Sequence, residues 1–216
     1  MIDLKDCKLR RYNAEVAATF EKLDCGKEDM NRFFYEDNDY YKYEKQMMTK
    51  SYCFTYEKDI VCIFTISNDS IKKNAFQGAK EDKARMIKRF PEEKEKIQSY
   101  PSVLIGRLGT NIKYRRQSKD EIGIGTQVIT FIKEWIASET NKTGCRFLIV
   151  DAYNEADVIR FYQEYNNFEF LIKDETVELN MFRGNIKEIT RLETRKMFFD
   201  LITIKNNQED ASRARK

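Results

Sequence analysis

The stretch Glu121-Ile122-Gly123-Ile124-Gly125-Thr126 lies between a strand-like run and an amphipathic helix, and it decides the fold. Upstream, the run 103–110 is rich in Val, Leu and Ile and predicts a strand bounded by Pro101. Downstream, apolar residues at helical spacing predict a helix over 124–138; they are Val128, Ile129, Ile132, Trp135 and Ile136. The two glycines therefore lie where a loop turns into a helix N-terminus.

A helix N-terminus that begins with glycine is suited to binding phosphate. Free backbone N–H groups and the positive end of the helix dipole attract the anion. Glycine matters because a side chain would hold the phosphate away from the backbone. A tight turn without a ligand explains the same two glycines, so the rest of the chain has to supply the context.

Length and charge limit the classes of function. A chain of 216 residues is sized for one large domain with a single core. Its charges nearly cancel to a net charge of +3, which is too little to predict nucleic-acid binding from charge alone. The N-terminus lacks the pattern of a signal peptide, and no apolar run is long enough to span a bilayer. We expect a cytoplasmic protein that does not enter the membrane.

The supply of reactive side chains narrows the chemistry further. The chain has no histidine, which excludes Ser-His-Asp and Cys-His hydrolases as they are usually built and most zinc chemistry. Proton transfer must therefore use carboxylates, Tyr, Lys, Cys or water. The cysteines are an odd number without close pairs, and we interpret them as reduced thiols rather than disulfides or metal ligands: Cys7, Cys25, Cys53, Cys62 and Cys145.

Outside this centre, the patterns predict a succession of short elements. Strands are expected over 2–12, 51–56, 60–67, 145–152, 168–172 and 195–204. Helices are expected over 13–23, 27–48 and 155–165, the last with Asn154 as its cap. Residues 72–98 are dominated by charged side chains and predict a solvated helical insertion. We predict one domain over 1–205 and a polar, frayed tail over 206–216.

The order of these elements resembles the GNAT superfamily of acetyl-CoA-dependent N-acetyltransferases over roughly residues 2–204. Residues 104–126 resemble the family's cofactor strand and pyrophosphate loop. Residues 150–154 resemble the end of the next strand with its cofactor-facing Asn. Residues 161–168 resemble the family's Phe-Tyr-x-x-x-Gly-Phe segment, with Asn167 in place of the usual glycine. Because Asn accepts a left-handed helix cap better than other non-glycine residues, the replacement fits the pattern.

The resemblance implies a fold and a reaction. The fold is α+β, with a mixed, mostly antiparallel central sheet flanked by helices in α-β-α layers. The reaction moves acetyl from acetyl-CoA to a primary amine of a small molecule, peptide or protein by direct attack in a ternary complex, without an acyl-cysteine. An open sheet edge in such a fold favours a homodimer.

The resemblance also implies which residues form the site. Backbone groups of Leu108, Gly109 and Thr110 would bind the pantetheine arm, and Gly109 suits a bulge and a close approach. Asn154 would bond to the pantetheine, and Tyr162 would protonate the departing CoA thiolate. The pyrophosphate would bind the loop 120–126, which contains Ile122, Gly123, Ile124, Gly125 and Thr126.

Several site residues have structural alternatives. Tyr162 shares a helical face with Val158, Phe161 and Tyr165, and such aromatic residues commonly pack in a core. Cys145 lies in an apolar strand, where we expect packing rather than nucleophilic chemistry. The general base is unassigned, with Glu57, Asp151 or a chain of water molecules as candidates.

The loop departs from the family pattern in its charge. The family usually places Gln or Arg where this chain has Asp120, which is followed by Glu121, and carboxylates beside a pyrophosphate are unfavourable. Residues 115–119 look like an insertion, from which Arg115, Arg116 or Lys119 would supply the missing positive charge. If they do not, the site is weakened, and the chain is a GNAT-like binding module without catalysis.

The sequence says least about which molecule accepts the acetyl group. Residues 20–26 and 29–34 resemble a GNAT branch that includes bacterial toxins acetylating aminoacyl-tRNA, although Asp24-Cys25-Gly26 also suits a turn between helices. Under the toxin hypothesis tRNA is a partner and a basic groove is expected. Its candidates are Lys42, Lys45, Lys72, Lys73, Arg115 and Arg116, among which acidic residues are interleaved.

Overall fold

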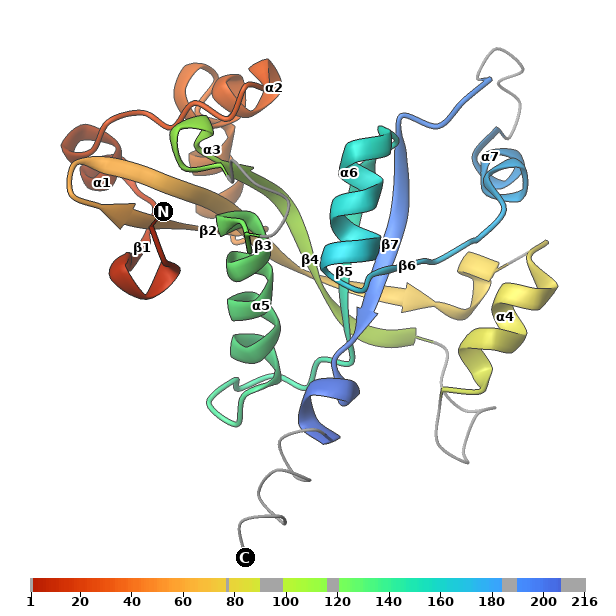
Figure 1. The fold of residues 1–216 in the computed structure, drawn as a ribbon. Helices are drawn as coiled ribbons and strands as arrows, with labels where there is room; N and C mark the ends of the chain where they lie inside the picture. Colours follow the sequence, from red (N-terminus) through yellow and green to blue (C-terminus); the bar gives the residue numbers. More distant parts are fainter. Residues whose placement is uncertain (1, 77, 90–98, 116–120, 184–189, 207–216) are drawn as a thin grey trace, which may run out of the picture. The chain divides into compact units, whose positions relative to one another are not determined.

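The computed structural model describes residues 2–76, 78–89, 99–115, 121–183 and 190–206 (Figure 1). In this part of the chain the strands are β1 (Lys8–Arg11), β2 (Lys50–Tyr56), β3 (Asp59–Lys72), β4 (Ser99–Thr110), β5 (Phe147–Tyr153), β6 (Glu169–Phe170) and β7 (Thr194–Asp200). They form one mixed sheet in the order β1-β2-β3-β4-β5-β7-β6. The predicted α+β class with a mixed sheet and flanking helices is confirmed.

Backbone contacts divide the chain into two compact units. The first unit comprises residues 1–68 and 104–136, and the second comprises residues 69–103 and 137–216. Each unit therefore combines segments that are far apart in the sequence. The single domain over 1–205 stays a prediction.

In the first unit, β2 and β3 form the antiparallel hairpin that the sequence predicts. Tyr56 pairs with Asp59, and the turn between them contains Glu57 with a positive φ of 51°. β1 pairs with β2 on its other side, also antiparallel. β3 is longer than the expected 60–67, because its polar second half continues in strand conformation without the apolar pattern that marks a strand in the sequence.

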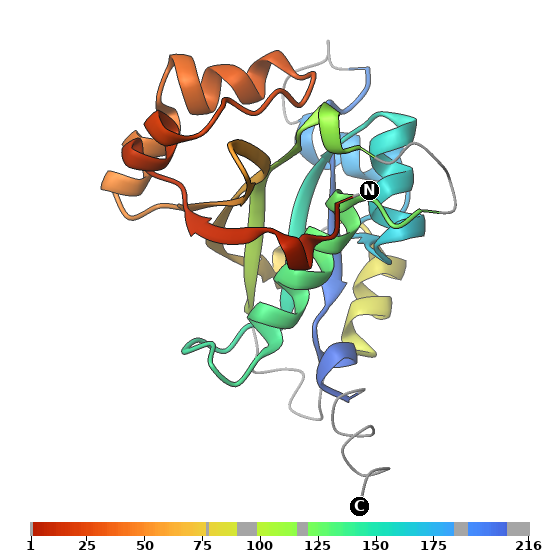
Figure 2. The same ribbon diagram turned by 60° about the vertical axis from the view of Figure 1, so that its left-hand side comes forward.

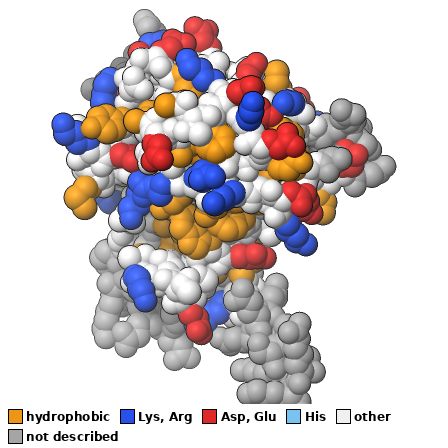
Figure 3. All heavy atoms as spheres, turned by 90° about the vertical axis from the view of Figure 1, so that its left-hand side faces the viewer, with side chains coloured by type: hydrophobic (Ala, Val, Ile, Leu, Met, Phe, Trp, Pro, Cys, Tyr) orange, Lys and Arg blue, Asp and Glu red, His pale blue; other side chains and the backbone are white. Residues whose placement is uncertain are grey.

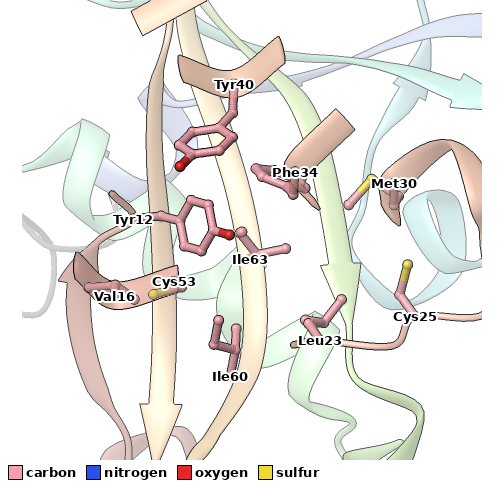
Figure 4. Packing of buried hydrophobic residues seen from close by; sticks show 10 residues of the cluster. All are labelled: Tyr12, Val16, Leu23, Cys25, Met30, Phe34, Tyr40, Cys53, Ile60 and Ile63. Carbon is pink, nitrogen blue, oxygen red and sulfur yellow. The ribbon is translucent and has the colours of Figure 1, made fainter. Parts of the chain in front are cut away.

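Alternate side chains of β2 lie on opposite faces of these strands. Tyr52 and Phe54 contact the helix α5 (Ile124–Ala137) through Trp135 and Phe131, with ring centroids 5.0 and 5.2 Å apart. Cys53 points to the other face, into a cluster of ten buried side chains (Figure 4). The helix predicted over 124–138 is thus confirmed, and it covers one face of the hairpin.

Tyr12 lies within the buried cluster on the other face and is fully buried (Figure 4). Its ring meets those of Phe34 and Tyr40 edge-on, with centroids 5.5 and 4.8 Å apart. Edge-on aromatic pairs contribute about 0.5–1.5 kcal/mol each beyond the burial of their area. Aromatic packing around Tyr12 therefore holds the N-terminal helices on the strands.

Three short helices precede β2 where the sequence predicts two longer ones (Figure 2). They are α1 (Ala14–Thr19), α2 (Glu28–Asn31) and α3 (Asp39–Lys45), with a π-helical turn over Arg32–Glu36. The helix expected over 27–48 is interrupted because Asn38 adopts a left-handed φ of 52°. The strand expected over 2–12 is also shorter, since a 3₁₀ turn precedes β1 and is capped by the Asp3 carboxylate.

In the second unit, β7 pairs antiparallel with both β5 and β6. The strand expected over 195–204 ends at Asp200, because the Asp200 carboxylate accepts a bond from the Ile202 N–H (3.2 Å) and the chain turns helical. β6 is limited to two residues of the expected 168–172. Pro101 lies inside β4 rather than at its boundary, and its carbonyl accepts a bond from the Arg146 N–H (2.8 Å).

The charged insertion contains a helix that packs against the protein with one face. In α4 (Lys80–Ile87), Met86 is buried and Arg85 donates to the carbonyls of Phe170 (2.7 Å) and Leu171 (3.0 Å). Arg85 also forms an ion pair with Glu169 at 2.8 Å. The expectation of a solvated insertion is therefore wrong for the packed face of α4 and holds for Lys80, Glu81 and Lys83, which are exposed; residues 90–98 lie outside the described part of the chain.

The helix predicted over 155–165 consists of α6 (Ala156–Arg160) and a π-helical turn over Phe161–Tyr165. At its end the Phe168 N–H donates to the Tyr162 carbonyl (2.9 Å) and the Asn167 N–H to the Gln163 carbonyl (3.1 Å). The bond from Asn167 is that of the αL capping motif, which requires a left-handed residue, and Asn167 supplies it with a φ of 53°. The expectation for Asn167 is confirmed.

A further helix, α7 (Glu175–Arg183), precedes β7 and is absent from the sequence predictions. Its start is marked by Asp174, whose carboxylate accepts bonds from the N–H groups of Thr176 (2.8 Å) and Val177 (3.3 Å). An acidic cap followed by Glu175 and Glu178 in the first turn was the available signal. Among the described residues, no helix is both long and apolar enough to cross a membrane.

Candidate active site

The glycine loop leads into α5 as the sequence predicts. The Gly123 carbonyl accepts bonds from the N–H groups of Thr126 (3.0 Å) and Gln127 (3.2 Å), so the helix begins at Ile124. Within the part of the chain that the structure describes, the N–H groups of Ile124 and Gly125 have no hydrogen-bond partner. These two donors lie at the positive end of the helix dipole, where they can bind an anion.

Gln127 holds the loop in place, which the sequence does not reveal. Its side-chain amide donates to the Ile122 carbonyl (3.1 Å) and accepts a bond from the Leu4 N–H (2.8 Å). Ile122 itself is exposed, whereas Ile124 is buried beneath the helix start. The loop therefore presents its backbone while one side chain anchors it to the protein.

The charges predicted near the loop divide between described and undescribed positions. Asp120, Arg116 and Lys119 lie outside the described residues. Arg115 donates from its guanidinium to the Cys25 carbonyl, so it binds the N-terminal segment. Of the three predicted cations, Arg116 and Lys119 therefore stay predictions as the source of positive charge near the loop. The Glu121 carboxylate would repel an anionic ligand there.

Gly109, in the strand predicted to bind pantetheine, has a close neighbour within the protein. A Cβ atom at Gly109 would lie 2.8 Å from the Met30 Cε and 3.3 Å from the Cys25 Cβ. The predicted close approach at Gly109 is thus made by the N-terminal segment. Leu108 and Thr110 are half-buried on either side of it, and their role in ligand binding stays a prediction.

The segment Asp24-Cys25-Gly26 forms a turn against the chain that follows β4. The Asp24 carboxylate accepts a bond from the Gly26 N–H (2.8 Å), and Gly26 has a positive φ of 68°. The Asp24 carbonyl accepts a bond from the Ile112 N–H at 2.8 Å. The segment therefore holds the chain immediately after β4 in place.

Asp59 pins the same region from the hairpin and was not found by sequence reasoning. Its carboxylate accepts bonds from the Lys113 ammonium (2.5 Å) and from the Tyr114 hydroxyl. The hydrogen bond from Lys113 is the main cause that lowers the pKa of Asp59. Burial, together with the Asp59 charge, raises the pKa of Tyr114 to about 12. Asp59 thus binds two adjacent residues, Lys113 and Tyr114, that are far from it in the sequence.

Asn154, in the second unit, does not cap α6 as the sequence suggests. The cap position is Glu155, which makes no side-chain capping bond. The Asn154 side chain instead donates to the Glu175 carboxylate (2.7 Å) and to the Leu192 carbonyl (3.0 Å). Two acceptors from a distant part of the chain outcompete the local cap.

Tyr162 is nearly buried, at 8% exposure. Its ring meets Phe161 and Phe168 edge-on, with centroids 5.0 and 5.4 Å apart. This packing fixes the ring, which suits both a core residue and a positioned acid. Its catalytic role therefore stays a prediction.

The other candidate groups are differently placed. Asp151 forms an ion pair with Lys196 at 2.8 Å, and Glu57 is exposed in the hairpin turn. Burial raises the pKa of Cys145 to about 11, so this thiol is not ionised at neutral pH, which favours packing over nucleophilic chemistry.

The predicted basic groove is only partly described. Lys42 forms an ion pair with Asp39 at 2.8 Å, while Lys45 and Lys72 are exposed. The side chain of Lys73 lies outside the described part, as does the whole of Arg116. Among the described cations of the groove, the charge of Lys42 is thus already neutralised by Asp39.

Comparison with known proteins gives matches in structure alone. No protein-family model matches the chain, and no curated protein matches its sequence. A tyrosine-to-phenylalanine variant of KacT aligns with a TM-score of 0.64 at 16% identity, over 93% of this chain and 98% of that one. AtaT complexed with acetyl-methionyl-tRNAfMet aligns with a TM-score of 0.60 at 18% identity, over 93% and 98%.

A third structure, AtaTR bound with AcCoA, aligns with a TM-score of 0.60 at 17% identity, over 93% of this chain and 97% of that one. KacT and AtaT are toxins with the GNAT fold. This chain has the GNAT fold. The predicted GNAT site residues belong to two sets: Leu108 to Thr110 with Ile122 to Thr126 lie in the first unit, and Asn154 and Tyr162 lie in the second.

The close contact at Gly109 generates a stability prediction. Gly109→Ala should lower the free energy of unfolding by about 1 kcal/mol, because the end of the Met30 side chain has to move and the Cys25 Cβ has to yield slightly to admit the methyl group. Gly144→Ala is the matched control, since nothing lies within 4 Å of its added Cβ. Urea unfolding of both variants measures the difference, and equal stability of the two variants would contradict the contact.

Proposed function

We propose that this chain is a GNAT acyltransferase that moves acetyl from acetyl-CoA to a primary amine. The observation that carries the proposal is the start of α5, where Gly123 opens the helix and the N–H groups of Ile124 and Gly125 point to no partner in the described chain. These donors come shortly after β4 in a chain with the GNAT fold. AtaTR, which has a similar structure, was solved with AcCoA.

Under this proposal, acetyl-CoA binds mainly through backbone groups of the protein. The pyrophosphate accepts bonds from the N–H groups of Ile124 and Gly125, where the helix dipole favours its charge. Glu121 opposes that charge, and Arg116 or Lys119 offsets it. The remaining donor-binding residues are those of the family pattern: Leu108, Gly109, Thr110, Ile122, Gly123, Thr126 and Asn154.

The transfer step needs one acid and one base. The amine nitrogen attacks the thioester carbonyl carbon, a C–N bond forms, and the C–S bond breaks with its electron pair moving to sulfur. The Tyr162 hydroxyl gives its proton to that sulfur, and the amine proton goes to Asp151, Glu57 or water. Holding the two reactants together in one complex supplies much of the rate, so no acyl-cysteine is required.

Aminoacyl-tRNA is the acceptor that a specific observation favours among primary amines. AtaT, similar in structure over most of both chains, was solved with acetyl-methionyl-tRNAfMet. Residues 20–26 and 29–34 of this chain resemble the N-terminal segment of that GNAT branch. Against it stands the small net charge of +3, which limits binding driven by phosphates alone. A small molecule, peptide or protein amine is the other acceptor class.

Cellular location and assembly complete the proposal. A cytoplasmic location agrees with cysteines that are all free. In the sheet order, β1 and β6 are the edges, and an open edge favours pairing with a second copy into a homodimer.

Labelled acetyl transfer distinguishes the acceptors. The protein is incubated with labelled acetyl-CoA and, separately, with methionyl-tRNA, uncharged tRNA, a lysine peptide and a polyamine. Label on methionyl-tRNA but not on uncharged tRNA is the expected result, because only the charged form carries the α-amino group. Label on the peptide or polyamine alone would assign the other acceptor class. No transfer to any of them would favour a binding module without catalysis.

Tyr162→Phe tests the acid. We expect turnover to fall at least tenfold with the fold intact, because a positioned acid contributes about 10²–10⁴ in rate. Tyr165→Phe is the control, a tyrosine of the same π-helical turn that is 36% exposed. Thiol release measures turnover, and thermal unfolding checks the fold. Unchanged turnover in Tyr162→Phe would mean that Tyr162 is a core-packing residue and not the acid.

A further inference from the structure

Asn154 is held at every donor it has. Its backbone N–H donates to the Glu193 carbonyl (2.8 Å), and its side-chain NH₂ donates to both the Glu175 carboxylate (2.7 Å) and the Leu192 carbonyl (3.0 Å). The Arg191 guanidinium donates to the Asn154 carbonyl. Since a carboxylate and a carbonyl accept only, they fix which end of the amide is nitrogen. The atom left for a ligand is the Oδ1, which can only accept.

Glu175 is itself held by a buried arginine. Its second carboxylate oxygen lies 3.5 Å from Arg195 Nη1, and the Arg195 side chain is 5% exposed. Arg195 Nε bonds to Glu178 at 2.5 Å, while Nη2 donates to the carbonyls of Ile172 (2.9 Å) and Lys173 (3.2 Å). Glu175 and Glu178 lie one turn apart on α7, so a single arginine of β7 binds both.

The two carboxylates have different surroundings. Glu178 is almost fully buried, and burial raises its pKa while the hydrogen bond from Arg195 opposes that shift. Breaking this pair would leave a buried charge without a partner and would cost stability. Glu175 is 38% exposed and faces both Arg195 and Asn154. Arg195 and Glu178 therefore fix α7 on β7. Because Glu175 belongs to α7, its hydrogen bond also fixes the position of the Asn154 side chain.

We propose that Glu175, backed by Arg195, is a positioning residue for acetyl-CoA. It holds the Asn154 carboxamide so that Oδ1 accepts a bond from an amide N–H of the pantetheine arm. Without Glu175 the Leu192 carbonyl alone would hold the amide, which would then rotate more readily than when a charged acceptor also fixes its orientation. This inference rests on the proposed function, in which Asn154 binds the pantetheine arm, and it adds Glu175 and Arg195 as the residues that orient Asn154.

Two ligands separate positioning from a loss of fold. Coenzyme A carries the pantetheine arm, and 3′-phospho-ADP is the same nucleotide without it. In Glu175→Ala we expect the dissociation constant for coenzyme A to rise about three- to tenfold, the effect of one hydrogen bond, with that for 3′-phospho-ADP unchanged. KM for acetyl-CoA should rise in parallel, with kcat and the acceptor KM unchanged. Calorimetric titration measures the affinities.

Two further variants complete the test. Glu175→Gln keeps an acceptor oxygen and should recover most of the affinity that Glu175→Ala loses. If Glu175→Ala does not fold, Glu175→Met, which removes both oxygens and keeps the length of the side chain, takes its place with the same expected loss. Glu139→Gln removes an exposed carboxylate of the same unit and should change neither affinity. Unchanged coenzyme A affinity in Glu175→Ala, or an equal loss for both ligands, would overturn the inference. Wild-type protein that binds neither ligand would instead remove the proposed function, and the inference with it.

Discussion

The packing of the N-terminal segment on the end of β4 is the constraint on which the first unit depends. A Cβ atom at Gly109 would displace the end of the Met30 side chain and crowd the Cys25 Cβ, because both lie close to its backbone. Asp24 and Asp59 then bind the chain immediately after the strand, through Ile112 and Lys113. These contacts set the point from which the chain departs toward the glycine loop. Packing within the protein thus favours glycine at position 109, independently of any ligand.

The groups predicted to bind acetyl-CoA share one physical property. Hydrogen bonds within the protein leave each of them either a hydrogen-bond donor or a hydrogen-bond acceptor for a ligand, but not both. At the start of α5, the carbonyl of Gly123 is used within the helix, and the N–H groups of Ile124 and Gly125 are left as donors. At Asn154, the donors are used by Glu175 and Leu192, and an acceptor is left. Donors suit a pyrophosphate, and an acceptor suits an amide N–H. The chemistry of acetyl-CoA supplies both partners.

Sequence reasoning succeeded where the signal is local. Helical spacing and a glycine before Ile124 predicted the start of α5, and the tolerance of Asn for a left-handed cap predicted Asn167. It failed where distant groups compete. Asn154 was expected to cap the helix beside it, but a carboxylate on α7 binds it instead. Likewise, the helix expected over 27–48 breaks at Asn38, where packing around Tyr12 outweighs the helical pattern.

The candidate site was predictable in its backbone parts and less so in its supporting side chains. Gln127, Asp59 and Glu175 were missed because each acts through a partner remote in the sequence, and no local pattern marks such pairs. Arg85 of α4 was expected in solvent for the same reason, since the carbonyls of Phe170 and Leu171 that bind it are not visible in the sequence pattern. Polar side chains are the hardest to place from sequence alone, because one residue type serves solvent and buried networks equally.

Thermal unfolding with increasing acetyl-CoA tests the central claim, that the start of α5 binds the pyrophosphate of this donor. The account predicts a saturable rise in Tm, equivalent to ~2.7 kcal/mol at 100 times the dissociation constant, and loss of that rise in Gly125→Glu. The glutamate would place a side chain and a negative charge where the phosphate approaches. No rise in the wild-type protein at millimolar acetyl-CoA, or an equal rise in Gly125→Glu, would contradict the claim.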